Sequence, residues 1–156
     1  MSLRVGMGVD AHAFADGVPL VLGGVTFESP RGLAGHSDGD VITHALIDAV
    51  LGAAGLGDIG SLFPSNSATP VGISSLDLLR DAVAQIRSAG YRVVNADCIL
   101  IGEQPRIADR RVEIGEVLTS LVGAPVNVRA TTTDGLGFTG RGEGLAAQAV
   151  ALVERA

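Results

Sequence analysis

Apolar and polar residues recur along this chain with two different periods, and each period predicts a kind of element. The run from Val5 to Val9 alternates apolar residues with Gly6 and Gly8, which is typical of a strand. Glycines inside a strand indicate that another backbone or subunit passes close by. From Val41 to about Ala54, apolar residues recur at helical spacing instead, which predicts a helix with one buried stripe.

The rest of the pattern alternates strands and helices through the second half of the chain. We expect a hairpin over 19–27, loops over 35–40 and 55–64, a helix from Ser74 or Ser75 to Gly90, a strand over 91–101, a helix around 114–121, a strand over 126–130 and a closing helix over 145–155. This order predicts an α/β (α+β) fold with a mixed sheet and helices on one face. At 156 residues, we expect a single domain over 1–156.

Composition narrows the functional classes. The net charge of −6 argues against a nucleic-acid partner, because such binding relies on Lys and Arg. Cys98 is the only cysteine and lies in an apolar run, so we expect a buried, inert thiol. Asp10, His12 and Asp16 fall where a secretory signal would be apolar, and we see no membrane span. We therefore expect a cytoplasmic protein with no membrane partner.

The chain has three histidines, and all lie beside carboxylates. Asp10 and His12 are two residues apart on a predicted strand, so their side chains share one face. With His44 they form a three-ligand set with an open fourth position, as in catalytic zinc sites. The alternative is that His12, His36 and His44 only cap turns and pair with acids. Asp48, one turn after His44, either orients that imidazole, contacts substrate or is a solvated helix acid.

A glycine-rich segment near the C-terminus is the second candidate for chemistry. It offers backbone N–H groups and the N-terminus of the predicted closing helix to an anion. Arg141 could bind a phosphate in a bidentate manner, and Asp134 could bind an oxygen-preferring cation such as Mg²⁺. Thr131, Thr132 and Thr133 add hydroxyl groups. The segment matches neither the Walker nor the dinucleotide motif.

Taken together, these segments resemble the 2-C-methyl-D-erythritol 2,4-cyclodiphosphate synthase family of the non-mevalonate isoprenoid pathway. The resemblance rests on the stretches 8–14, 36–44, 56–60 and 131–144, and it runs through the chain from about Arg4. It implies a homotrimer with active sites between subunits. It also implies cyclisation of 4-diphosphocytidyl-2-C-methyl-D-erythritol 2-phosphate to the 2,4-cyclodiphosphate, with release of CMP.

The resemblance also implies roles for individual residues. Zinc would be held by Asp10, His12 and His44, and a second cation, Mg²⁺ or Mn²⁺, by Asp134. His36 and Thr132 would steady the transition state. The implied substrate contacts, from the methylerythritol phosphate through the cytidine to the diphosphate, are Asp10, His12, His36, Ser37, Asp58, Ile59, Gly60, Phe63, Pro64, Ser65, Asn66, Ser67, Gly102, Glu103, Gln104, Pro105, Arg106, Ile107, Ala108, Thr131, Thr132, Thr133, Asp134, Phe138 and Arg141.

The chain departs from the usual family pattern at three places. Asp134 stands where Glu is usual, which changes the reach to the second cation. The stretch 65–72 lacks the usual acidic residues and Lys-Gly pair, and Arg106 replaces a common Lys.

Two other functions fit some of these residues. A metal-dependent phosphohydrolase of a nucleotide-like metabolite would use water as nucleophile, and a metabolite-binding module would not catalyse. The synthase uses the substrate's own anionic phosphate, so it requires proximity and charge neutralisation rather than a protein base.

Overall fold

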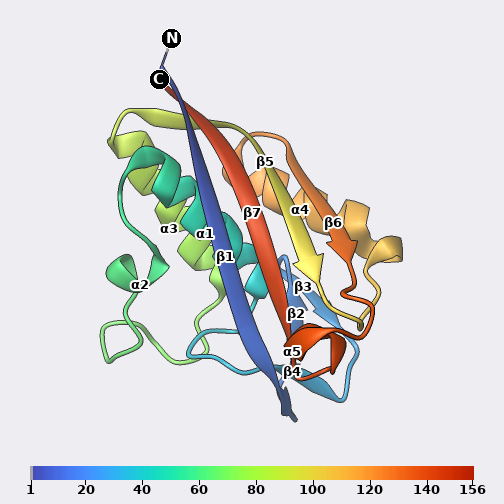
Figure 1. Ribbon diagram of the computed structural model, residues 1–156. Helices are drawn as coiled ribbons and strands as arrows, with labels where there is room; N and C mark the ends of the chain where they lie inside the picture. The colour runs from blue at the N-terminus through green and yellow to red at the C-terminus, as the bar shows by residue number, and fades with distance from the viewer. Residues whose placement is uncertain (1) are drawn as a thin grey trace.

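A five-stranded mixed sheet lies at the centre of the computed structural model, which describes residues 2–156 (Figure 1). The strands are β1 Leu3–Asp16, β2 Leu20–Leu22, β3 Val25–Phe27, β4 Arg31–Leu33, β5 Tyr91–Ile101, β6 Val126–Thr131 and β7 Gly144–Arg155. The helices are α1 Val41–Ala54, α2 Ile59–Leu62, α3 Ser75–Ser88, α4 Arg111–Val122 and α5 Gly137–Gly140, with a 3₁₀ turn η1 Ala108–Arg110. The predicted mixed α+β class is confirmed.

The sheet has the strand order β4-β1-β7-β5-β6, and β2 pairs with β3 in a separate hairpin. β5 and β6 run parallel, with α4 as their connection, whereas β7 is antiparallel to both β1 and β5. Helices α1, α3 and α4 lie together behind the sheet in Figure 1. The long strands β1 and β7 therefore present one helix-covered face and one open face.

Close packing of α1 against β1 explains the glycines in the first strand. A Cβ atom on Gly6 would lie 2.0 Å from the carbonyl oxygen of Ala49, and one on Gly8 would lie 1.9 Å from that of Ala45. The expected close approach of a backbone is confirmed, and the approaching backbone is α1 of the same chain rather than another subunit. Helix α1 is also buried on more than one stripe, because β5, β7 and α3 contact it as well as β1.

The C-terminal segment is strand β7, where the sequence predicted a closing helix over 145–155. Its four alanines favour a helix by intrinsic propensity. In the fold, however, Ala147, Ala149 and Ala151 alternate onto the face that α1 covers and are at most 1% exposed. Small side chains at these positions let α1 lie close to the sheet, so tertiary packing overrides local propensity.

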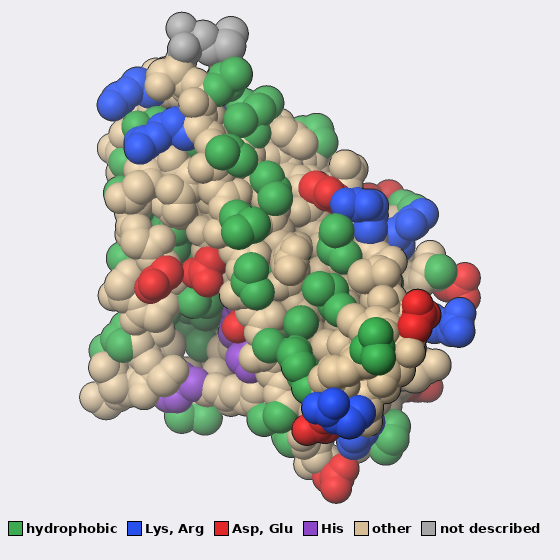
Figure 2. All heavy atoms as spheres, in the orientation of Figure 1, with side chains coloured by type: hydrophobic (Ala, Val, Ile, Leu, Met, Phe, Trp, Pro, Cys, Tyr) green, Lys and Arg blue, Asp and Glu red, His purple; other side chains and the backbone are tan. Residues whose placement is uncertain are grey.

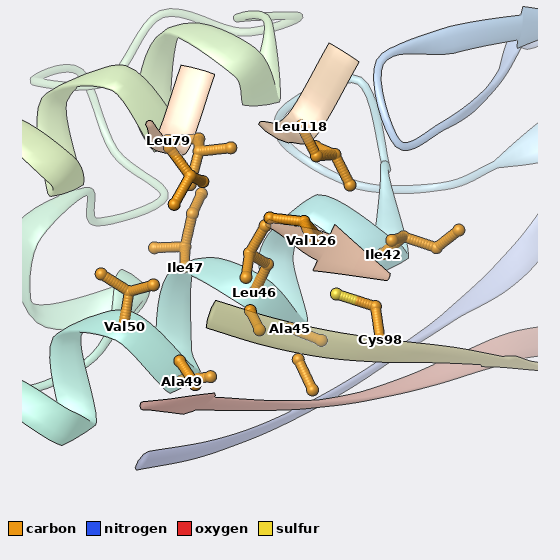
Figure 3. Close-up of a cluster of buried hydrophobic side chains, with 14 of the residues drawn as sticks. Ile42, Ala45, Leu46, Ile47, Ala49, Val50, Leu79, Cys98, Leu118 and Val126 are labelled. Atoms are coloured by element: carbon orange, nitrogen blue, oxygen red, sulfur yellow. The ribbon is translucent and has the colours of Figure 1, made fainter. Parts of the chain in front are cut away.

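The core lies between α1, the sheet and the helices α3 and α4. Figure 3 shows Ile42, Leu46 and Val50 of α1 among side chains from these other elements. Cys98 of β5 lies in this cluster with no exposed surface, and burial raises the pKa of its thiol to about 12. The expected burial of the cysteine is confirmed, and the raised pKa is in keeping with the predicted inert thiol.

The open face of the sheet carries an apolar stripe. Leu3, Val5, Met7 and Val9 of β1 are 51–68% exposed, and Val150 of β7 is 45% exposed. Figure 2 shows hydrophobic side chains running along this face over β1 and β7. Among the described residues, the helices are all too short or too polar to cross a membrane.

Candidate active site

Three ligand-type side chains converge where β1 passes the start of α1. Gly6 lies under Ala49 and Gly8 under Ala45, so Asp10 and His12, next on the same face of β1, lie beside the first turn of α1. That turn carries His44, which is 7% exposed. Asp10 Oδ2 lies 2.7 Å from His12 Nε2 and 3.1 Å from His44 Nδ1, and the two nitrogens are 3.2 Å apart.

The electrostatics of this cluster favour a charged carboxylate. Burial alone would raise the pKa of Asp10, but the hydrogen bonds with His12 and His44 outweigh it and lower that pKa to about 2. The hydrogen bond to Asp10 in turn raises the pKa of His12, against the effect of burial. At neutral pH the Asp10 carboxylate is therefore ionised and able to serve as an oxygen ligand.

The donor set fits a small divalent metal. The chosen atoms of Asp10, His12 and His44 all lie within 4.8 Å of one another. Zinc bonds of about 2.0–2.1 Å in a tetrahedron give ligand–ligand edges of about 3.3 Å. The measured separations of 2.7–3.2 Å are close to that size. The three atoms can thus occupy three corners and leave the fourth for a substrate oxygen.

The second nitrogen of His44 is held by two hydroxyl groups. Its Nε2 lies 2.8 Å from Ser75 Oγ and 2.9 Å from Ser37 Oγ. The expectation that Asp48 could orient this imidazole is wrong. Asp48 Oδ1 instead accepts the backbone N–H of Ile59 at 2.7 Å, and so holds the start of α2 beside the cluster. Burial raises the pKa of Asp48.

A cavity of about 180 Å³ opens over the three ligands, and we call it the histidine cavity. Most of its lining residues are ones that the resemblance implied as metal ligands or substrate contacts. Its lining residues are Asp10, His12, His36, Ser37, His44, Ile59, Gly60, Phe63, Ser65, Thr69 and Leu78. His36 Nε2 donates a hydrogen bond to the carbonyl oxygen of Thr69. Four other predicted contacts belong to the same stretch of chain but do not line the cavity: Asp58, Pro64, Asn66 and Ser67.

Local sequence explains the loop over 55–64, which contains the short helix α2 that the sequence did not predict. Asp58 caps it by accepting the N–H of Ser61 at 2.8 Å, and the Ser61 hydroxyl contacts the backbone of Asp58. Sequence reasoning also missed Thr69, Ser75 and Leu78. Ser75 had a usable signal, because a serine at the start of a predicted helix can bond to groups outside the helix.

A second cavity, of about 230 Å³, lies at the C-terminal ends of β5 and β6, and we call it the threonine cavity. Its lining residues are Gly102, Glu103, Pro105, Arg106, Ile107, Ala108, Arg111, Ala130, Thr131 and Thr132. All but Arg111 and Ala130 are among the substrate contacts that the resemblance implied. Gln104 and Thr133 lie outside this lining.

The glycine-rich segment is mostly exposed. Thr131 and Thr132 line the threonine cavity, and the residues after them line neither cavity. Asp134 accepts a hydrogen bond from the Thr132 hydroxyl at 3.1 Å, and Arg141 Nε donates to Glu143 at 2.6 Å. The anion site expected at a helix N-terminus is wrong, because β7 rather than a helix follows the segment. The four-residue α5 inside it is too short for a helix dipole to matter.

The two cavities share no lining residue, and His36 and Thr132 line different ones. They also belong to different strands, since β7 separates β1 from β5 and β6, at whose ends the threonine cavity lies. One chain therefore presents two separate groups of the predicted site residues.

A match to the model of the YgbB family, over residues 3–154, decides the relationship. The chain belongs to the YgbB family. Its relatives include the 2-C-methyl-D-erythritol 2,4-cyclodiphosphate synthases of Rubrobacter xylanophilus, 54% identical with 98% of this chain and 96% of the relative covered, and of Desulfatibacillum aliphaticivorans, 51% identical with 97% and 100% covered. The resemblance found in the sequence is confirmed.

Solved structures of similar sequence share the fold. The bifunctional IspDF of Campylobacter jejuni superimposes with a TM-score of 0.95 at 37% identity, covering 99% of this chain and 43% of that one. A CDP-bound 2C-methyl-D-erythritol-2,4-cyclodiphosphate synthase superimposes with a TM-score of 0.87 at 35% identity, covering 97% and 100%. This YgbB-family chain is an enzyme of the cyclodiphosphate synthase type, as its relatives are named.

Proposed function

We propose that this protein cyclises 4-diphosphocytidyl-2-C-methyl-D-erythritol 2-phosphate to 2-C-methyl-D-erythritol 2,4-cyclodiphosphate and releases CMP, in isoprenoid precursor biosynthesis. The observation that carries this proposal is the convergence of Asp10, His12 and His44 in one cavity with His36 and Ser37. The relatives named as this synthase, at about 50% identity, support the same reaction.

The reaction defines what the residues must do. An oxygen of the substrate's 2-phosphate attacks the β-phosphorus, and the bond from that phosphorus to the bridging oxygen of CMP breaks. The attacking oxygen is already anionic, so the protein must hold the two phosphates together and offset their charge. A zinc ion held by Asp10, His12 and His44 would supply positive charge beside the diphosphate.

The other residues then have supporting tasks. His36, with Nε2 donating to Thr69, keeps its ring fixed and faces the histidine cavity beside Ser37, so it orients a phosphate rather than removing a proton. The threonine cavity takes the cytidine, in keeping with relatives whose solved structures hold CDP. Asp134 holds the second cation, Mg²⁺ or Mn²⁺, and Arg141 binds the diphosphate.

We further propose a homotrimer whose active sites lie between subunits. Two observations support it: the exposed apolar stripe on β1 and β7, and the absence of shared lining residues between the histidine and threonine cavities. Packing the open sheet face against neighbours would bury the stripe, and it would place one subunit's threonine cavity beside the next subunit's histidine cavity. In this proposal the chain acts as a single synthase domain over 1–156, in the cytoplasm.

The direct test is ³¹P NMR of the protein with the proposed substrate, Zn²⁺ and Mg²⁺. A cyclic diphosphate appearing with CMP is the expected result. CMP with a linear bisphosphate would mean that water is the nucleophile, and the phosphohydrolase function would replace this proposal. No turnover by zinc-loaded protein would leave a binding module.

The shared site has its own test, which uses two inactive variants. Subunits carrying His44→Ala and subunits carrying Thr132→Ala damage different cavities. Random co-assembly at equal amounts should restore about a quarter of wild-type activity, because both halves of a site are then intact in about one interface in four. A mixture of His44→Ala with His12→Ala is the matched control and should stay inactive. No recovery in the first mixture would contradict sites between subunits.

A further inference from the structure

The loop before α1 contains a carboxylate, Asp38, that the proposed reaction does not use. Its side chain is partly buried and contacts the start of α3. Asp38 Oδ2 accepts the backbone N–H of Ser75 at 2.9 Å, and the Ser75 hydroxyl donates a hydrogen bond to Asp38 Oδ1. Ser75 is the first residue of α3 and has no exposed surface. A serine hydroxyl is thus fixed in one orientation, deep beside the histidine cavity.

The same hydroxyl oxygen lies 2.8 Å from His44 Nε2. The other nitrogen of that ring, Nδ1, is the one that points at Asp10 and His12. A neutral imidazole that binds a metal through Nδ1 carries its hydrogen on Nε2. The Ser75 hydroxyl uses its hydrogen in the bond that it donates to Asp38, so the lone pairs of its oxygen can accept the Nε2–H of His44.

We propose that Asp38 and Ser75 are positioning residues for the metal site. They form a relay in which Asp38 accepts from the Ser75 hydroxyl, and Ser75 accepts from His44 Nε2. The relay holds the His44 ring in the tautomer that presents the lone pair of Nδ1 to the metal. This inference rests on the proposed metal site, and it deepens it by naming residues that set metal affinity without touching the metal.

Ser37 is the competing partner of the same nitrogen, and the contacts favour Ser75. Ser37 Oγ lies 2.9 Å from His44 Nε2 and also accepts the N–H of Gly39 at 3.3 Å. Among the described side chains, it has no carboxylate partner comparable to Asp38. A hydroxyl that donates to a carboxylate is polarised and accepts more strongly. Ser37 also lines the histidine cavity, where its hydroxyl is available to substrate.

The test is zinc affinity, measured by competition with a chromophoric chelator, in wild type and in Ser75→Ala. The substitution removes the hydroxyl but keeps the backbone N–H that Asp38 caps, so the start of α3 is retained. The dissociation constant for zinc should rise about 10- to 100-fold, as for other residues that orient a metal ligand. Asp38→Asn should also raise it, and the double variant should lose less than the product of the single effects, because both act through one chain of hydrogen bonds.

Two matched variants and a spectrum separate positioning from structural support. Ser75→Thr keeps the hydroxyl and should bind zinc more tightly than Ser75→Ala, while Ser37→Ala should weaken zinc less than Ser75→Ala does. Cobalt-loaded Ser75→Ala should show altered visible bands, because the His44 ligand is less well fixed. A merely structural role would lower the melting temperature of the metal-free and zinc-loaded forms equally and leave zinc affinity unchanged.

The outcomes distinguish this inference from the proposed function. A wild-type protein that does not bind zinc would overturn the metal site itself. Tight zinc binding by wild type, with the Ser75→Ala constant within about twofold of it, would overturn only the relay. A loss in Ser37→Ala equal to or greater than that in Ser75→Ala would overturn the assignment of Ser75 as the partner of His44.

Discussion

The histidine cavity and the threonine cavity differ in how their side chains are held. Asp10 and His12 are on a paired strand and His44 is on a buried helix, and all three contact one another at 2.7–3.2 Å. In the threonine cavity, Thr131 and Thr132 are exposed at the end of an edge strand. Their hydroxyls donate to a neighbouring carbonyl and to Asp134, groups that are exposed as well.

This difference indicates which part of the proposed active site a single chain can form. A metal site needs three atoms fixed within a few tenths of an ångström, and regular elements with buried contacts provide that. The threonine cavity is lined largely by loop residues that follow β5 and β6, which fits the proposal that a neighbouring subunit completes it. The three candidate metal ligands therefore come from one chain, whereas in the proposed trimer substrate binding would depend on assembly.

Removing one imidazole of the metal cluster should have the largest effect on zinc binding and turnover. His44→Ala should abolish zinc binding and turnover, because two remaining ligands cannot hold the ion tightly. His36→Ala is the matched control: it removes an imidazole of the same cavity but not a ligand, so it should keep zinc and lose most turnover. Zinc content by elemental analysis and ³¹P turnover assays check both. Full activity in zinc-free His44→Ala would refute the proposed mechanism.

A charge on the open sheet face should abolish assembly and turnover but leave zinc binding intact. Met7 is 68% exposed at the middle of the apolar stripe, and burying a glutamate there would cost several kcal/mol in a trimer. Met7→Glu should therefore be monomeric by light scattering and lose nearly all turnover, yet bind zinc as wild type does.

The matched control for that variant is Val71→Glu, at an apolar position in the loop before α3 that is 82% exposed. It adds the same charge away from the stripe and should remain trimeric. A trimeric Met7→Glu protein would show that the subunit interface lies elsewhere.

How far the sequence predicted the fold depended on whether local and tertiary preferences agree. Helix α1 was predicted over its observed range from its apolar spacing. In the structure the local capping residues agree with that spacing, because Asp40 caps the N-terminus and Gly55, at a φ of 72°, caps the C-terminus. In β7 the two preferences disagree. Alanines there are required by the close approach of α1 from 100 residues away in sequence, and no local pattern contains that information.

The part of the site on regular elements was predictable from the sequence, and the part that depends on loop contacts was not. Asp10 and His12 share a face by strand geometry alone, and His44 follows on the next predicted helix, so the metal cluster was predictable. Ser75 and Thr69 were not, because they reach the cluster through loop contacts between 36–38 and 69–75. The resemblance covered the nucleotide residues, and no geometric argument from sequence did so.

Arg141→Lys should produce a smaller, graded effect. In the structure Arg141 pairs with Glu143, and both side chains are about 60% exposed, so this ion pair is weak and can be exchanged for a diphosphate. Replacing a planar, bidentate group by a point charge should raise KM about tenfold, with a smaller change in kcat. Steady-state kinetics measure this.

Arg80→Lys is the control for that change. Arg80 makes an equally short and exposed pair, with Asp77 on α3, and lies in neither cavity. Its KM should match wild type. If Arg141→Lys also leaves KM unchanged, Arg141 does not bind the diphosphate.

The smallest effect should come from Asp134→Glu, which tests the loop that belongs to the threonine side. Asp134 has a φ of 53°, a left-handed conformation that Asp adopts more readily than Glu, so the variant should lose up to about 1 kcal/mol of stability. The longer side chain reaches one methylene further toward the second cation. Mg²⁺ demands near-ideal octahedral geometry of its ligands, and we expect Mn²⁺ to accept a less regular geometry. Activity with Mg²⁺ should therefore rise a few-fold relative to activity with Mn²⁺. Zinc content should not change, because Asp134 is outside the histidine cavity. An identical Mg²⁺-to-Mn²⁺ activity ratio in both proteins would remove Asp134 from the second cation and leave the metal chemistry entirely to the buried cluster.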